Sequence, residues 1–467
     1  MAAEQTQEMR PFSTKDKIGY LFGDFGNDFT FILSSSFLMK FYTDVMGVPG
    51  GVVGIIMMIA RFVDAFTDVT MGRICDRSRV TPAGKFKPWI RRMCGPVAIS
   101  SFLIYQSGLA GMPLAFKIGW LFVTYILWGS IFYTSINIPY GSMASAISAE
   151  SGDRQSLSTF RTMGGTLAGL VIGAGVPMLA YDQVEGKAVM NGGRFTVIAG
   201  IFSLLAIGCY LLCYALTTER VRIEAPVNKE ENGVFTMLKN AAKNRALISI
   251  IAASIVMLLA QLTMQSMANY VYPNYYGNTA AQSASTIVMV VATMIAAGFA
   301  KPLAAKIGKA EVSVVSNLLA AGVCVLLYFV RPENVWVYVA LNGLCWFGLG
   351  MFSMVSWALI TDVIDYSELK NGIREDGSVY ALYSFARKLG QAASAGLTGA
   401  LLTLIGYTQE TAFDETVVNG VFNISTLVPA LGLVLLAAVL WFWYPLHKKQ
   451  VEENIAALKE KYKKQEK

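Results

Sequence analysis

The chain has 467 residues, of which 54% are hydrophobic and only 15% are charged, whereas soluble domains carry about 25% charged residues. This composition excludes an ordinary soluble domain and favours a membrane protein with many spans. The net charge of +7 would suit a nucleic-acid-binding protein, but in so apolar a chain we attribute it to Lys and Arg on cytoplasmic loops. We therefore expect no nucleic-acid partner. The first 17 residues are polar, so we predict no cleavable signal peptide.

The residues that usually carry enzyme chemistry are scarce. The six cysteines form no Cys-X-X-Cys motif and no Cys/His cluster, so we interpret them as packing residues. The single histidine, His447, ends the last apolar run, where it suits the membrane interface. A membrane enzyme would need a nucleophile–base pair or a metal site facing water, and the sequence contains no HExxH motif. We expect no enzymatic activity and no cofactor.

Apolar segments long enough to span a bilayer recur along the whole chain. A spanning helix needs ~20 mostly apolar residues, and we predict twelve such helices. In chain order they cover residues 17–44, 50–74, 90–109, 117–147, 154–181, 195–217, 246–272, 281–304, 311–330, 334–363, 378–406 and 418–446. The predicted fold class is an all-α membrane protein.

Basic residues alternate between the two sides of the predicted helices. The connection Arg73–Arg92 is rich in Lys and Arg, whereas Val45–Gly51, on the opposite side, has none. Positive connections face the cytoplasm, so both termini are predicted to be cytoplasmic. The longest polar break, Thr218–Arg245, separates two sets of six helices. We therefore predict two pseudo-symmetric bundles, 1–217 and 246–446, a cytoplasmic linker over 218–245, and a cytoplasmic tail over 447–467 that is either a charged surface helix or frayed.

Three charged residues lie inside the second predicted helix. Arg61, Asp64 and Asp68 have the spacing i, i+3 and i+7, so their side chains project from one face. A charge at the centre of a bilayer costs at least ~2.5 kcal/mol. Such a face must therefore look into a water-filled or solute-filled interior, with Arg61 balancing the two carboxylates.

Polar groups from five helices fall at one depth. Counted from the cytoplasmic ends at 1.5 Å per residue, each lies ~12–15 Å into the bilayer, near its middle. They are Asp28, Asp64, Asn137, Arg161 and Lys388. Convergence at the midplane is where alternating-access carriers hold their solute. The alternative is a set of structural ion pairs, for example Arg61 with Asp64, or Lys388 with a carboxylate of the second helix.

The residue types in this layer indicate the chemistry. Two carboxylates at i and i+4 can share a small hard cation, or one of them can carry a proton. Asp28, Asn137, Arg161 and Lys388 offer the mixture of donors and acceptors that sugar hydroxyls need. Four neighbours at the same level can add hydroxyls or a ring, although packing is the competing interpretation. These neighbours are Tyr133, Thr134, Tyr383 and Ser384.

Several sequence motifs occur in an order typical of one transporter family. The runs GYLFGDFGNDF, KFYTDVMG, ARFVDAFTDVTMGRICDRSR, GKFKPW, INIPYGSM, TDVIDYSELKNGIREDGSVY and SFARKLGQA lie between Lys17 and Leu446. In these runs the chain resembles the glycoside–pentoside–hexuronide:cation symporters of the major facilitator superfamily. The resemblance implies two six-helix bundles rocking around a central sugar site. It also implies a monomer in the bacterial inner membrane that takes up sugar uphill with Na⁺, Li⁺ or H⁺.

The resemblance also implies roles for single residues. In the melibiose permease branch, the counterparts of Asp64 and Asp68 hold the cation (Na⁺ in a sodium-coupled carrier), aided by a hydroxyl matching Thr134. The counterpart of Asp28 binds the sugar together with a basic residue matching Arg161. A lysine matching Lys388 lies beside the carboxylates.

This chain departs from that branch at three positions of the predicted pocket. It has Asn137 where the branch has a sugar-binding aspartate, Gly141 in place of a tryptophan, and Asn27 in place of a lysine. INIPYGS and FARKLGQA are closer to the glucuronide permease branch. The sequence therefore predicts cation-coupled sugar symport by alternating access. It leaves two alternatives: a proton-coupled glucuronide permease, rather than an Na⁺-coupled carrier of neutral glycosides, and a transport-like membrane sensor.

Overall fold

The computed structural model describes residues 10–221, 244–371 and 376–465, so most of the predicted linker 218–245 lies outside the described residues. Within them, each of the twelve predicted segments is helical. The α-helices are α1 (Thr14–Asp44), α2 (Gly50–Arg77), α3 (Lys87–Ile104), α4 (Leu114–Ile126), α5 (Thr134–Ile147), α6 (Ser151–Leu179), α7 (Gly192–Leu216), α9 (Arg245–Tyr270), α10 (Thr279–Ile307), α11 (Lys309–Val330), α12 (Val335–Asn371), α13 (Asp376–Leu404), α14 (Glu415–Ala438) and α15 (Lys448–Gln465).

Three π-helical segments and one short 3₁₀ helix complete the helical part of the described residues. The π segments η2 (Leu127–Tyr133), η3 (Val271–Tyr275) and η4 (Val439–Trp443) each continue an α-helix, and η1 (Ser107–Leu109) follows α3. In the described part of the chain, the only sheet is a hairpin of β1 (Tyr181–Val184) and β2 (Lys187–Met190). Its turn residues Glu185 and Gly186 both have positive φ, at 50° and 77°, as a two-residue hairpin turn requires.

Eight helices of the described chain are long and apolar enough to cross a membrane. The predicted segments outside this set are α1, α2, α3 and α13. The sequence of the continuous helix α2 includes the charged residues Arg61, Asp64, Asp68 and Arg73, and α3 has only 18 residues. Polar side chains in these helices lower their apolar character without preventing helix formation.

The described chain divides into two compact units. Unit 1 contains the described residues up to Val48, Phe62–Tyr181, and those from Met190 to 221. Unit 2 contains Pro49–Arg61, Asp182–Val189 and the described residues from 244 onward. The first part of α2 belongs to unit 2 because it packs tightly on α13. A Cβ atom on Gly54 would lie 2.7 Å from the carbonyl oxygen of Ala395.

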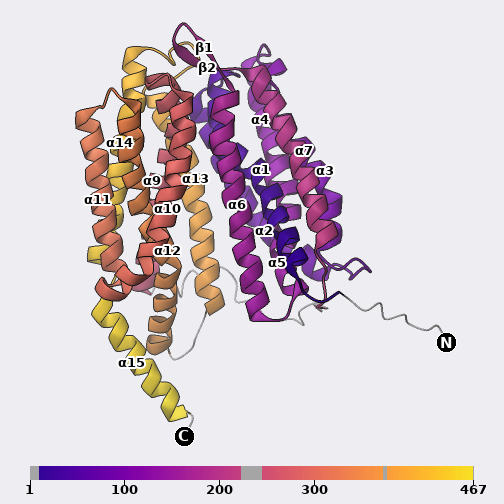
Figure 1. Cartoon of the computed structure of the whole chain (residues 1–467), viewed down its shortest axis with the longest axis vertical. Helices are drawn as coiled ribbons and strands as arrows, with labels where there is room; N and C mark the ends of the chain where they lie inside the picture. Colours follow the sequence, from indigo (N-terminus) through magenta and orange to yellow (C-terminus); the bar gives the residue numbers. More distant parts are fainter. Residues whose placement is uncertain (1–9, 222–243, 372–375, 466–467) are drawn as a thin grey trace, which may run out of the picture. The chain divides into compact units, whose positions relative to one another are not determined.

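In unit 1, α1 is the central helix, between α6 and α7 (Figure 1). Glycines allow both contacts to be close. A Cβ atom on Gly164 of α6 would lie 2.5 Å from the carbonyl oxygen of Leu21, and one on Gly26 of α1 would lie 3.2 Å from that of Ala206 on α7. Small residues permit such backbone approach between membrane helices. The polar residues of α1 are thereby held against both neighbours.

In unit 2, α15 is an ordered helix that packs against α11 and α12 (Figure 1). The sequence left a frayed tail as an alternative, and the structure favours the helix. Leu446 just before it and Leu458 within it are buried, at 1% and 6% exposure. Lys461 pairs with the buried Glu368 of α12 at 3.0 Å. Apolar contact and a charge pair together hold the helix in place.

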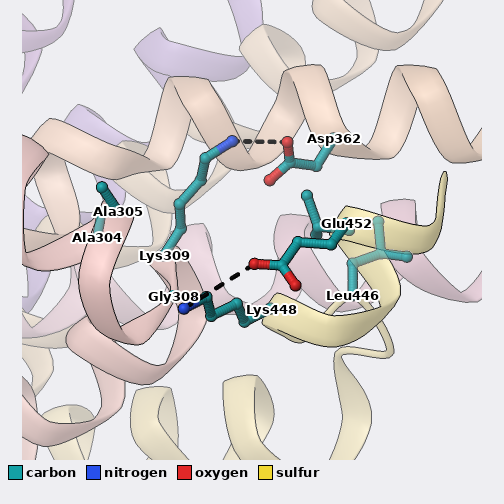
Figure 2. A pocket seen from close by; sticks show the side chains of 9 residues that line it. Ala304, Ala305, Gly308, Lys309, Asp362, Leu446, Lys448 and Glu452 are labelled. Atoms are coloured by element: carbon teal, nitrogen blue, oxygen red, sulfur yellow. Dashed lines mark hydrogen bonds and ion pairs between the residues drawn. The ribbon is translucent and has the colours of Figure 1, made fainter. Parts of the chain in front are cut away.

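A cavity of about 120 Å³ lies where α15 meets the turn between α10 and α11. Figure 2 shows Lys309 reaching across to Asp362, at 2.6 Å, and Glu452 near Lys448. None of the predicted site residues lines this cavity. The candidate site is therefore built elsewhere in the molecule.

Candidate functional site

The two carboxylates of α2 each accept a hydrogen bond from a hydroxyl on the η2–α5 helix. Ser130 Oγ donates to Asp64 Oδ1 at 2.5 Å, and Thr134 Oγ1 donates to Asp68 Oδ1 at 2.9 Å. Each pair is separated by 66 residues, which is the pattern of two parallel helices in register. Two carboxylates and two hydroxyls therefore form consecutive rungs between α2 and the η2–α5 helix.

The π-helical segment η2 ends at Tyr133, directly before Thr134. Thr134 Oγ1 also lies 3.2 Å from the carbonyl oxygen of Gly129, five residues earlier. A π-helical turn adds a residue to the turn and often occurs at functional sites, because it leaves carbonyl groups available and changes the side-chain register. Here it places Ser130 and Thr134 opposite Asp64 and Asp68.

Every side-chain atom named in these rungs is an oxygen. Carboxylate, hydroxyl and carbonyl oxygens are the ligands of hard cations. A hydroxyl carries one hydrogen and two lone pairs, so it can donate to a carboxylate or turn its lone pairs toward a cation. The geometry is therefore suited to binding either a small monovalent cation or a proton.

A second carboxylate pair lies on α1. Arg161 of α6 donates from Nε to Asp24 Oδ1 at 3.0 Å, and its guanidinium lies 5.3 Å from the centre of the Tyr140 ring. A Cβ atom on Gly165 would lie 2.6 Å from Asp28 Oδ2 and 3.1 Å from Asp24 Oδ2. The two carboxylates therefore converge over a glycine of α6, one turn from Arg161.

Asn137 is linked to the interior of unit 1 through two other polar side chains. Asn27 Nδ2 donates to Asn137 Oδ1 at 3.4 Å, and Tyr210 Oη donates to Asn27 Oδ1 at 2.9 Å. Asn27 and Tyr210 are both 1% exposed. Three helices, α5, α1 and α7, are joined by this chain of hydrogen bonds.

The structure thus brings five predicted residues of unit 1 into two polar sets. Asp64, Asp68 and Thr134, on α2 and α5, form one, and Asp28 and Arg161, on α1 and α6, form the other. Asn137 lies one turn after Thr134 on α5. Tyr133 is half-buried, with its ring 5.6 Å from that of Phe31 on α1.

The other predicted residues belong to unit 2. Tyr383 is fully buried, and its hydroxyl accepts a hydrogen bond from Ser254 at 2.7 Å, an arrangement typical of a packing residue. Lys388 is half-buried and Ser384 exposed on the same helix, α13. Arg61 is half-buried at the end of the α2 segment that belongs to unit 2. That these residues share a layer with Asp28 and Asp64 stays a prediction.

Four residues of the hydrogen-bonded groups described above were not among the predicted ligands: Asp24, Asn27, Ser130 and Tyr210. A signal for Asp24 was available, since Asp24 and Asp28 repeat the i, i+4 spacing of Asp64 and Asp68. Asn27 was recognised only as a departure from the melibiose permease branch. The sequence offers no comparable signal for Ser130 or Tyr210, because their roles depend on the π-helical register and on the packing of α7.

Comparison with known proteins points to one family. The family model described as MFS/sugar transport protein matches residues 19–448. The uncharacterized symporter YjmB of Bacillus subtilis is 30% identical over 96% of both chains. The glucuronide carrier protein homolog of Escherichia coli is 28% identical over 96% of both chains. The isoprimeverose transporter of Lactiplantibacillus pentosus is 27% identical over 97% of this chain and 94% of its own.

Solved structures with the same fold are more distant in sequence. A bacterial homolog of the human lysosomal transporter Spinster superposes with a TM-score of 0.67 at 11% identity, over 94% of this chain and 97% of its own. A D-xylose–proton symporter superposes with a TM-score of 0.59 at 15% identity, over 92% and 97%. At these identities the likeness shows the all-helical fold alone. Because the family model covers almost the whole sequence, the chain belongs to the MFS/sugar transport protein family, whose members are multi-pass membrane transporters and not enzymes.

Proposed function

We propose that this protein is a cation-coupled sugar symporter that works by alternating access. In this proposal twelve helices span the bacterial inner membrane, both termini are cytoplasmic, and the bundles 1–217 and 246–446 move around the site as a monomer. The coupling ion is Na⁺, Li⁺ or H⁺. The helices formed over all twelve predicted segments support this topology.

The observation that carries the proposal is the pair of rungs Asp64–Ser130 and Asp68–Thr134. Carboxylates at membrane depth are maintained where an ion is handled. A bound cation or proton would neutralise negative charge on α2 and would break the donation of the hydroxyls to the carboxylates. The η2–α5 helix would then change its contacts with α2.

Coupling between ion and sugar follows from α5, which contributes Thr134 to the ion site and Asn137 to the proposed sugar ligands. Thr134 contacts the α2 carboxylate Asp68, and Asn137, one helical turn later, contacts Asn27 of α1. A shift of α5 on ion binding would therefore move a proposed sugar ligand. By linkage, the sugar and the ion raise each other's affinity by the same factor.

The proposed sugar ligands of unit 1 are Asp28, Asn137 and Arg161, with Tyr133 beside them. Asp28 accepts from sugar hydroxyls, and the guanidinium of Arg161, whose Nε donates to Asp24, can donate from the N–H groups of its Nη atoms. Lys388 is the proposed contribution of unit 2. We do not include Tyr383, since its hydroxyl is engaged by Ser254.

A second candidate is a proton-coupled glucuronide permease. Two observations favour it: the likeness of INIPYGS and FARKLGQA to that branch, and the relative named as a glucuronide carrier protein homolog. Asn137 removes one negative charge from the pocket, which would make a uronate easier to accommodate. Asp28 opposes this reading, because a carboxylate repels an acidic sugar.

Reconstitution into liposomes tests the proposal. Purified protein is given p-nitrophenyl α- and β-galactosides, a β-xyloside and a β-glucuronide under an imposed Na⁺ gradient or an imposed proton gradient. We expect at least one sugar to accumulate above its external concentration. Loss of accumulation when choline replaces Na⁺ identifies sodium coupling, and loss with a protonophore identifies proton coupling. Equilibration without accumulation under both gradients would refute coupling, and no protein-dependent entry of any sugar would refute sugar transport.

A further inference from the structure

A buried series of hydrogen bonds runs from Tyr210 through Asn27 to Asn137, and neither Tyr210 nor Asn27 is among the proposed ligands. The geometry points to a positioning role: Tyr210 and Asn27 orient the Asn137 amide so that its Nδ2 hydrogens face the sugar. This inference rests on the proposed function, since it assumes that Asn137 is a sugar ligand.

The direction of the hydrogen bonds defines the orientation. Tyr210 Oη donates to Asn27 Oδ1, and Asn27 Nδ2 donates to Asn137 Oδ1. The Oδ1 atom of Asn137 is thus occupied by the hydrogen bond from Asn27 of α1. Its Nδ2 lies on the other branch of the same amide and keeps two hydrogens for donation.

Burial makes this orientation persistent. Asn27 and Tyr210 are each 1% exposed, and a buried amide or hydroxyl that loses its hydrogen-bond partner destabilises the folded state. Loss of either hydrogen bond would therefore leave buried polar atoms without a partner. A fully satisfied buried network holds its members in one arrangement.

The close packing of α1 on α7 also holds these hydrogen-bonded side chains in place. Gly26, next to Asn27, brings α1 so close to α7 that an added Cβ would lie 3.3 Å from Cδ1 of the Tyr210 ring. Asn137 itself is half-buried, as a residue must be if one side of its amide is anchored and the other meets a solute. Side chains anchored by neighbours on rigid helices give the most exact ligand geometry.

The consequence concerns specificity. An aspartate at position 137 would present only acceptors and would select a hydroxyl hydrogen of the sugar. The oriented Asn137 presents donors, so it selects an oxygen lone pair: a ring oxygen, a hydroxyl oxygen or a carboxylate oxygen. Tyr210, which does not touch the sugar, would contribute to affinity only through Asn137.

A double-mutant cycle tests this indirect action. The dissociation constant of the purified protein is measured for the same four p-nitrophenyl sugars in the wild type, Tyr210→Phe, Asn137→Ala and the double variant. We expect Tyr210→Phe alone to weaken binding of at least one sugar by roughly 3- to 10-fold, the size of one lost hydrogen bond. In the Asn137→Ala background the same change should alter binding by less than about 1.5-fold, because the two residues act in series.

Tyr214→Phe is the matched control. Tyr214 lies one turn further along α7, and its ring lies 4.9 Å from Lys87 Nζ, a contact that phenylalanine retains. It should leave sugar binding unchanged in both backgrounds. If Tyr210→Phe does not fold, Asn27→Leu replaces it in the cycle, since it cuts the chain at the middle with a side chain of similar size.

Each outcome is decisive. A strongly reduced effect of Tyr210→Phe in the Asn137→Ala background supports the inference. Equal losses in both backgrounds, or no loss in the wild-type background, overturn it while sugar transport stands. No binding of any of the four sugars by the folded wild type overturns the proposed function, and this inference with it.

Discussion

Unit 1 contains two carboxylate pairs with the same spacing and different hydrogen-bond donors. On α1, Asp24 accepts from the guanidinium of Arg161, and Asp28 lies one turn away. On α2, Asp64 and Asp68 accept from the hydroxyls of Ser130 and Thr134. Both pairs have the spacing i, i+4, so the helix geometry alone does not distinguish them.

The donors make the difference. A guanidinium is always charged and only donates, so it suits recognition of a sugar that must be held in one orientation. A hydroxyl donates or accepts, so it can hold a carboxylate in one state and a cation in the next. We therefore propose that the α1 pair recognises the sugar and that the α2 pair exchanges the ion.

The largest effect is expected from a substitution in the α1 pair, which should change sugar binding and leave the ion effect unchanged. Asp28→Asn should weaken sugar binding by ~10- to 100-fold, the range for hydrogen bonds to a charged group. The ratio between sugar affinities with and without the coupling ion should stay the same. Titration of the sugar in saturating Na⁺ and in choline measures both quantities. An unchanged sugar dissociation constant would remove Asp28 from the binding site.

A substitution beside the α2 pair should instead change the ion effect and leave sugar affinity without the ion nearly unchanged. Thr134→Val removes the hydroxyl beside Asp68 and should reduce the effect of the ion on sugar affinity by roughly 5- to 10-fold. Sugar affinity without the ion should change little. Thr134→Ser keeps the hydroxyl and serves as the control. Equal behaviour of the valine and serine variants would show that the hydroxyl is not an ion ligand.

Asp24→Asn tests the interaction between the α1 pair and its donor, Arg161. The amide oxygen can still accept from Arg161 Nε, but the charge that fixes the guanidinium is lost. We expect sugar binding to weaken by roughly 3- to 10-fold, with the ion effect retained. The same titrations measure it. If the ion effect disappeared instead, the two pairs would not have separate roles.

The smallest effect is expected far from both pairs. Lys461→Met removes the ion pair with Glu368 that helps to hold α15, and should lower the free energy of unfolding by about 1 kcal/mol. Lys459, exposed on the same helix, gives the matched control Lys459→Met. Thermal unfolding measures the loss. A change in sugar or ion affinity in Lys461→Met would show that α15 acts on the site.

The helices were predictable because apolar length and charge placement determine them almost alone. The candidate site was predictable where charge marked it, since Asp28, Asp64, Asp68 and Arg161 stand out in apolar segments, and at Thr134, which the family resemblance indicated. Ser130 does not stand out, because serine is common in membrane helices and its role depends on the π-helical turn η2 before Thr134. Tyr383 was chosen for its predicted depth alone, and the sequence could not show that its buried hydroxyl accepts from Ser254 within unit 2.

We propose that Asp64 and Asp68 bind the ion that drives uptake. It is tested most directly by sugar accumulation in proteoliposomes carrying Asp64→Cys or Asp68→Cys, with an imposed ion gradient and with sugar binding measured on the same preparations. Both variants should bind sugar and let it equilibrate, while only the wild type concentrates it. Accumulation at the wild-type level in both variants would contradict the claim.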